Sequence, residues 1–288
     1  MSAASPCEPV SVTVAPNGAR RGKSDHRAIP LTPAEIAAEA RACQAAGAAI
    51  LHLHVRAPDG SHSLDAGRYR EAIAAVREAC DIVIQPTTER VGVFAPDDMM
   101  AVFRALAPEM ITFNLDELLD PDDAPRQGRV RDFLGEVDAA GTVPQYIVYS
   151  AEQLATLRRW WEAGWLPQAR PFILLVLGRY AGSVSRPADL LACLPLIPER
   201  WRWGLCAFGA PELACVVQAA LAGGHCRVGF ENNLLAPDGT PLADNTEQVA
   251  RLAGILAALG MPLATPADVR RTFGLAGRRQ DERTQSCC

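Results

Sequence analysis

The chain has 288 residues, of which 49% are hydrophobic and 21% charged, and its formal net charge is −5. This composition is typical of a globular protein that buries a substantial core, and the acidic balance argues against a nucleic-acid partner, because nucleic-acid binders usually carry a basic excess. No charge-free run of 18 apolar residues is present, and the first ten residues lack the basic and apolar regions of a signal peptide. We therefore expect a cytoplasmic protein without a membrane partner.

Short segments rich in β-branched residues alternate along the chain with segments of helical periodicity. The expected strands cover residues 10–14, 48–55, 82–86, 111–115, 144–149, 172–177, 202–208 and 226–230. The expected helices cover residues 32–46, 68–79, 97–106, 128–139, 151–163, 187–195, 211–222 and 245–259. Thr32 is the expected N-cap of the first helix and Gly47 lies just beyond its end.

Eight β/α units predict a (β/α)₈ TIM barrel, in which parallel strands lie inside a ring of helices. The barrel is expected as one catalytic domain over residues 10–276, between an N-terminal tail (1–9) and a flexible C-terminal tail (277–288). A doubly wound sheet is the alternative. It would normally carry a GxGxxG turn after the first strand, and the corresponding segment reads APNGARRG, which is a poor match.

The second expected strand contains His52 and His54 within an otherwise apolar run. Side chains two apart on a strand point the same way, about 7 Å apart along the chain, so two imidazoles can converge on one ion. Neutral imidazole is a common zinc ligand. The alternative is a pair of histidines on the wet face of a half-buried strand.

In a barrel of this kind, functional groups gather at the C-terminal ends of the strands and in the loops that follow them. Many polar residues fall at these expected positions. They are Asn17, Arg20, His52, His54, Arg56, Gln85, Thr87, Thr88, Thr112, Asn114, Asp116, Gln145, Tyr149, Arg227, Glu231, Asn232 and Asn233. All of them are expected to face one rim.

A catalytic zinc site usually has three protein ligands and one open position. Glu231, at the end of the eighth expected strand, is favoured as the third ligand beside His52 and His54. His225 is the rival, but it opens that strand and should point to the opposite rim.

Several motifs occur in order along the chain: an NGA turn after the first strand, LTPAEIAAEA, AGAAILHLHVRAPDG, IQ-x-T-T, GGHCRVGFENN and PLATPADVR. With these motifs, residues 10–275 resemble the β-keto acid cleavage enzyme family, whose founding member cleaves 3-keto-5-aminohexanoate. The resemblance implies a zinc-dependent (β/α)₈ acyltransferase that converts a β-keto acid and acetyl-CoA into acetoacetate and a new acyl-CoA. It also implies a homo-oligomer, expected as a tetramer.

The resemblance implies His52, His54 and Glu231 as metal ligands and Arg227 as a catalytic arginine. A salt bridge within the rim is the alternative for Arg227. Thr87 keeps a hydroxyl that can bind the substrate carboxylate, although the two glycines that usually follow are replaced by Glu89 and Arg90. Thr112 and Asn114 match polar positions that line the family's pocket.

Two departures from the family pattern bear on the chemistry. Asn232 stands where the family usually has an aspartate, so it can orient Arg227 but cannot accept a proton. Arg20 stands where the founding member has a glutamate that meets an ammonium group, and a second family glutamate matches Gln145 or Ile147 here. We therefore expect a substrate whose distal end is neutral or anionic, unless Arg20 points to solvent or to the CoA phosphates.

Two other functions are considered. A metal-dependent hydrolase would need further histidines at strand ends, and His26, His62 and His225 do not occupy such positions. A diverged barrel of the same family that binds metal with a different or lost activity is the main alternative.

Overall fold

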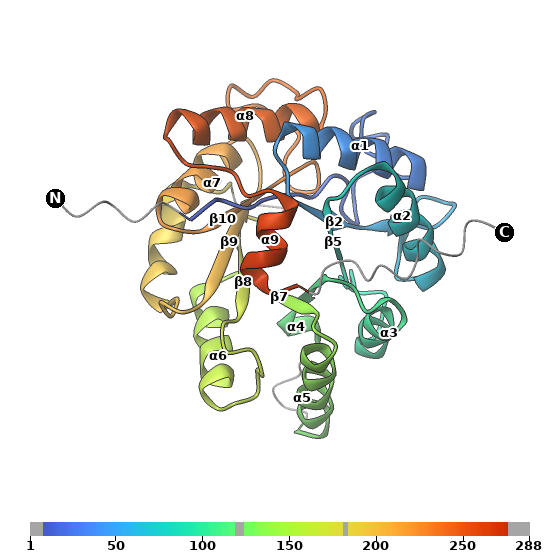
Figure 1. Cartoon of the computed structure of the whole chain (residues 1–288), viewed down its shortest axis with the longest axis vertical. Helices are drawn as coiled ribbons and strands as arrows, with labels where there is room; N and C mark the ends of the chain where they lie inside the picture. Colours follow the sequence, from blue (N-terminus) through green and yellow to red (C-terminus); the bar gives the residue numbers. More distant parts are fainter. Residues whose placement is uncertain (1–7, 119–123, 181–183, 276–288) are drawn as a thin grey trace.

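The computed structural model describes residues 8–118, 124–180 and 184–275. Eight parallel strands form a nearly closed barrel in the order β5-β2-β1-β10-β9-β8-β7-β6 (Figure 1). These strands are β1 (Val12–Val14), β2 (Ile50–Leu53), β5 (Val83–Pro86), β6 (Met110–Asn114), β7 (Val143–Val148), β8 (Phe172–Leu177), β9 (Arg202–Ala207) and β10 (His225–Val228). Thr88 Oγ1 donates to Thr112 O at 2.8 Å, which links the segment after β5 to β6. The predicted TIM barrel is confirmed.

Helices surround the barrel (Figure 1). They are α1 (Pro33–Ala46), α2 (Ala66–Ala79), α3 (Pro96–Leu106), α4 (Leu115–Leu118), α5 (Ala124–Ala139), α6 (Ala151–Glu162), α7 (Glu212–Leu221), α8 (Asn245–Ala258) and α9 (Pro266–Phe273). The N-cap prediction for α1 is confirmed, because Thr32 Oγ1 accepts from Glu35 N at 3.3 Å and Gly47 closes the helix with φ 118°. Of the expected tails, residues 1–7 and 277–288 lie outside the described residues.

The prediction of an α-helix over residues 187–195 is wrong. Two short 3₁₀ segments, η1 (Pro187–Ala192) and η2 (Leu194–Leu196), take its place. Pro195 has no N–H to donate, and in an α-helix its ring would clash with the carbonyl four residues earlier, so an α-helix cannot continue through residue 195. A small hairpin of β3 (Val55–Arg56) and β4 (His62–Ser63) was also not anticipated.

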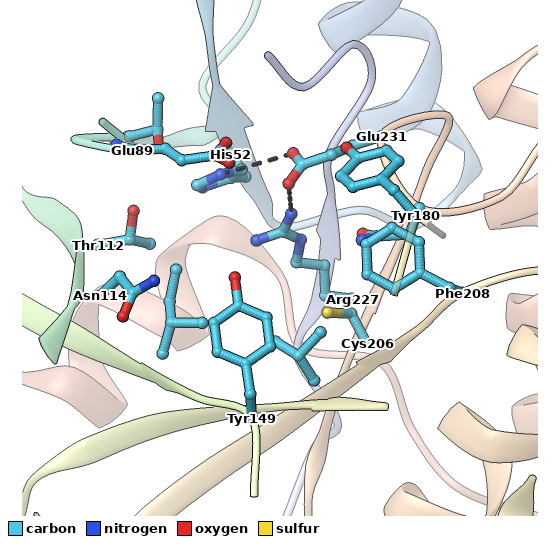
Figure 2. A pocket seen from close by; sticks show the side chains of 14 residues that line it. His52, Glu89, Thr112, Asn114, Tyr149, Tyr180, Cys206, Phe208, Arg227 and Glu231 are labelled. Atoms are coloured by element: carbon cyan, nitrogen blue, oxygen red, sulfur yellow. Dashed lines mark hydrogen bonds and ion pairs between the residues drawn. The ribbon is translucent and has the colours of Figure 1, made fainter. Parts of the chain in front are cut away.

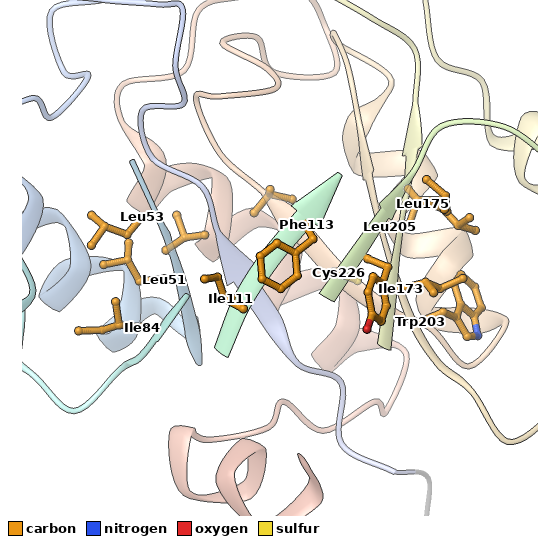
Figure 3. Packing of buried hydrophobic residues seen from close by; sticks show 14 of the residues in the cluster. Leu51, Leu53, Ile84, Ile111, Phe113, Ile173, Leu175, Trp203, Leu205 and Cys226 are labelled. Atoms are coloured by element: carbon orange, nitrogen blue, oxygen red, sulfur yellow. The ribbon is translucent and has the colours of Figure 1, made fainter. Parts of the chain in front are cut away.

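Alternation along the strands separates an outer layer from the barrel interior. Leu51, Leu53, Ile111, Phe113 and Leu205 belong to the large cluster between the strands and the surrounding helices (Figure 3). Their neighbours in sequence face the interior. The strands therefore present one set of side chains to the helices and a separate set to the barrel axis.

Helix α9 covers the end of the barrel where the strands begin. Val269 and Phe273 pack with Ile50, Val83 and Phe172, which are the first residues of β2, β5 and β8. His225 lies at this end too, with its ring centroid 6.0 Å from that of Phe172. The candidate site lies at the opposite end, where the strands finish.

Trp161 packs inward from α6, with its ring centroid 5.6 Å from that of Trp201, and Trp160 stacks on Trp165.

Within residues 8–118, 124–180 and 184–275, no helix combines the length and apolar character needed to cross a membrane.

Candidate active site

Three buried side chains converge where β2 and β10 end. His52 Nε2 lies 3.1 Å from His54 Nε2, and Glu231 Oε2 lies 3.2 Å from His54 Nε2 and 3.6 Å from His52 Nε2. The ligand atoms of the three residues all lie within 4.8 Å of one another. The structure thus brings together the three residues that the sequence analysis named as metal ligands, and it leaves His225 at the other end of the barrel.

Glu231 reaches this point through a turn, because β10 ends at Val228 and not at residue 230 as expected. Gly229 has φ 145°, and a Cβ there would collide with the Ala15 carbonyl oxygen. This close approach lets Glu231 N donate to Ala15 O at 3.1 Å. Ala15, directly after β1, therefore helps to position Glu231, and only glycine at position 229 allows the two segments to approach so closely.

The NGA turn after β1 fits closely beneath the same carboxylate. Gly18 has φ 60°, and a Cβ on it would collide with Cγ of Glu231. Arg56 holds the turn in place by donating to the carbonyl of Gly18 and to that of Arg21, the latter at 2.8 Å. The turn and Glu231 therefore form one packed unit.

We expect Gly18→Ala to lower zinc affinity about 10-fold to 100-fold, in the range seen when groups that orient a ligand are lost. Gly60→Ala is the matched control, because Gly60 also has a positive φ of 85° but nothing lies near its missing Cβ. In both variants, an alanine in the left-handed conformation lowers stability by about 1–2 kcal/mol. Competition with a chelator measures zinc affinity, and equal losses in the two variants would contradict the packing account.

A hydrogen-bond chain fixes the tautomer of His52. Nδ1 of His52 donates to Gln85 Oε1 at 3.1 Å, and Gln85 Nε2 donates to Gln145 Oε1 at 3.2 Å. Nε2 of His52 therefore presents a lone pair to His54 and Glu231. Burial and the charge of Arg227 hold the pKa of His52 well below its usual range, which keeps the imidazole neutral.

Arg227 forms a buried ion pair with Glu231 through Nη2 and Oε1. Although burial alone would raise it, the positive charge of Arg227 holds the pKa of Glu231 well below its usual range. No donor with hydrogen-bond geometry reaches Glu231 Oε2 from the described part of the chain. Two imidazole nitrogens and one ionised carboxylate oxygen, all facing a common point, fit the His₂Glu donor set of a catalytic zinc site.

A cavity opens beside His52, Glu231 and Arg227, which are among its lining residues (Figure 2). Fourteen side chains from seven of the strands and their loops line it: His52, Thr87, Glu89, Thr112, Asn114, Ile147, Tyr149, Val176, Tyr180, Cys206, Phe208, Arg227, Glu231 and Asn232. Thr112 Oγ1, Asn232 Oδ1 and Arg227 Nε have no hydrogen-bond partner among the residues that the structure describes. These unsatisfied polar atoms are available to a ligand.

Two residues that were predicted to contact the substrate, Gln145 and Arg20, do not line the cavity. Gln145 is not among the residues that line the cavity, and it supports His52 through Gln85 instead, whereas Ile147 does line it. Arg20 lies at the mouth, where its Nη2 is 3.4 Å from Glu89 Oε1 and its guanidinium lies over the Tyr180 ring at 5.2 Å. The expected role of Asn232 in orienting Arg227 through its side-chain oxygen is not seen, because that oxygen has no partner.

Tyr180, Phe208 and Cys206 were not predicted as site residues, and Glu89 was noted only as a departure from a family pattern. Tyr180 and Glu89 lie in loops, where periodicity gives no signal. Phe208 follows directly after β9, and that position is the signal that could have identified it, as it did for Tyr149 after β7.

A model of the beta-keto acid cleavage enzyme family matches residues 9–275. The 3-keto-5-aminohexanoate cleavage enzyme of Fusobacterium nucleatum subsp. nucleatum is 32% identical over 277 residues, covering 93% of this chain and 98% of that protein. The 3-oxoadipate:acetyl-CoA acetyltransferase of Cupriavidus necator is 27% identical, covering 96% and 99%. Type I 3-dehydroquinate dehydratase from Clostridium difficile superposes with a TM-score of 0.58 at 12% identity, covering 87% and 93%, and shares the fold.

Proposed function

Because this chain belongs to the β-keto acid cleavage enzyme family, we propose that it transfers an acyl group between a β-keto acid and acetyl-CoA. The products are acetoacetate and the CoA thioester of the remaining acyl group. The observation that carries the proposal is the convergence of His52 Nε2, His54 Nε2 and Glu231 Oε2 on one point, with His52, Glu231 and Arg227 lining the cavity beside it. The names of relatives that use acetyl-CoA support the cosubstrate.

His52, His54 and Glu231 are proposed to hold a zinc ion. When bound, zinc acts as a Lewis acid that polarises a carbonyl oxygen. Gln85 keeps His52 in the ligating tautomer, and Arg227 keeps Glu231 ionised.

Arg227 is proposed to act on the substrate as well as on Glu231. Its Nε has no partner within the described residues, so the guanidinium keeps one free donor near the cavity. A buried, permanently charged donor stabilises negative charge that develops on a substrate oxygen. The hydroxyls of Thr87 and Thr112 and the amide of Asn114 are proposed to bind the substrate carboxylate.

We propose that the distal end of the substrate is neutral or anionic. Guanidinium groups surround the aromatic mouth of the cavity: Arg20 and Arg21 lie over Tyr180 at 5.2 and 5.4 Å, and Arg179 lies over Tyr149 at 4.1 Å. Glu89, an acid that lines the cavity, is already paired with Arg20. Named relatives act on substrates of either charge, so the mouth of this chain is the better guide.

The experiment is an acetoacetate assay of the zinc-loaded protein with acetyl-CoA and β-keto acids that end in an ammonium, a neutral group or a carboxylate. We expect turnover with neutral or anionic acids. Zinc binding without turnover on any acid would favour the diverged barrel with another activity. A preference for the 5-amino-3-keto acid would contradict the proposed charge of the substrate.

Arg20→Gln is expected to shift kcat/KM toward the amino-bearing acid by about 10-fold relative to the anionic acid. One pair of charges about 4 Å apart is worth roughly 4 kcal/mol at an effective dielectric of 20, and solvent at the half-exposed Arg20 screens most of it. Arg27→Gln removes the same charge from the exposed part of the same loop and should leave the ratio unchanged. An unchanged ratio in Arg20→Gln would show that Arg20 does not select substrate.

A further inference from the structure

Glu89 places a carboxylate inside the cavity from the loop that follows β5. Its side chain is 22% exposed, and Figure 2 shows it extending toward His52 and Glu231. Hydrogen bonds hold its backbone on both sides: Glu89 N donates to Thr87 Oγ1 at 3.1 Å, and His62 Nε2 donates to Glu89 O at 2.8 Å. The carboxylate is therefore presented by a fixed piece of backbone, and its partner Arg20 approaches from the exposed side.

The other titratable groups that line the described cavity are poor proton acceptors. His52 uses Nδ1 to donate to Gln85 and directs Nε2 to the candidate metal site, and Glu231 is committed to Arg227 and the histidines. Burial raises the pKa of the Cys206 thiol to about 12 and raises the pKa of the Tyr149 and Tyr180 phenols. These three groups therefore already carry their protons near neutral pH. Asn232 accepts no proton near neutral pH. Glu89 is the group that remains.

We propose that Glu89 is the general base of the proposed acyl transfer, taking a proton from the carbon between the ketone and the carboxylate of the β-keto acid. This inference rests on the proposed function. The C–H electron pair passes into an enolate, whose carbon attacks the thioester carbonyl of acetyl-CoA and releases CoA thiolate. The thiolate attacks the original ketone, the carbon–carbon bond to that ketone breaks, and acyl-CoA leaves. Glu89 returns the proton to the acetoacetate enolate, so no other reactant is needed.

The surroundings of Glu89 suit a base that must give its proton back. Burial raises the pKa of its carboxyl above the usual value, which makes the carboxylate a stronger base than one in water. The ion pair with Arg20 opposes that rise. A carboxylate on this loop thus supplies the proton acceptor that Asn232 cannot.

The test compares Glu89→Gln with the wild type in two assays of the zinc-loaded protein. One assay measures acetoacetate formation, and the other follows by NMR the exchange of the substrate α-protons in D₂O without acetyl-CoA, corrected for the enzyme-free rate. We expect kcat to fall about 10²-fold to 10⁴-fold and enzymatic exchange to disappear, as for loss of a general base. Glu89→Asp should recover part of both. Glu109→Gln is the matched control, because Glu109 is also a half-buried carboxylate paired with an arginine, Arg270 of α9 at 2.6 Å, but it does not line the cavity.

The outcomes separate this inference from the proposed function. Wild-type turnover that Glu89→Gln retains would overturn the inference and leave the proposed function intact. Wild-type α-proton exchange that Glu89→Gln loses, without acetoacetate from any β-keto acid, would support Glu89 as a base and overturn the acyl transfer. Loss of zinc from Glu89→Gln would overturn the inference by making Glu89 part of the metal site.

Discussion

His54→Ala is expected to lose zinc on dialysis and to lower kcat by about 10³-fold or more, because a Lewis acid contributes several kcal/mol to stabilising the transition state. His54 contacts both other candidate ligands, at 3.1 Å to His52 Nε2 and 3.2 Å to Glu231 Oε2, so its removal leaves only two ligands. Metal analysis of the dialysed protein and the acetoacetate assay measure the two effects.

His225→Ala is the matched control for that variant. It also removes a buried imidazole, but one that packs against Phe172 and Phe273 at the opposite end of the barrel. We expect it to cost about 1–3 kcal/mol of stability, because Ser11 N loses its acceptor, while zinc content stays normal. Zinc lost from His225→Ala and kept by His54→Ala would show that the metal site is built elsewhere.

Arg227→Met is expected to lower kcat by about 10²-fold to 10³-fold while zinc is retained, as for loss of one donor to a developing negative charge. Its effect on stability should depend on zinc. Without metal, Glu231 loses its cation inside the barrel, and breaking such a buried pair costs about 3–5 kcal/mol. With metal, the ion compensates Glu231, so the loss should be smaller.

Denaturant unfolding of the wild type and Arg227→Met, each with and without zinc, measures this difference. Arg227→Lys keeps the charge without the planar fork, and it should preserve stability better than activity. Equal destabilisation of Arg227→Met with and without zinc would mean that the ion does not bind beside Glu231.

The parts of the fold that local sequence determines were predicted well. Alternation within one strand was enough to place His52 and His54 on the same side, and the run at 172–177 has the predicted bounds. Gln145 shows the limit of that reasoning. Residues 145 and 147 both face the interior, but alternation cannot tell which of two interior layers reaches the cavity, and the structure gives that place to Ile147.

The features that were missed depend on contacts between distant segments. The turn that carries Glu231 forms because Gly229 lies against Ala15, more than 200 residues earlier in the chain. The pairing of Arg20 with Glu89 joins two loops, and neither loop has a periodic pattern from which the contact could be read. The homotetramer and the cytoplasmic location stay predictions.

The central claim is that the acetyl group of acetyl-CoA becomes part of acetoacetate. The most direct test supplies acetyl-CoA labelled with carbon-13 in both acetyl carbons, together with an unlabelled neutral or anionic β-keto acid. The account predicts acetoacetate labelled in its ketone and methyl carbons, an unlabelled new acyl-CoA, and no product with His54→Ala. Unlabelled acetoacetate, or label that remains on CoA while the keto acid is consumed, would contradict it.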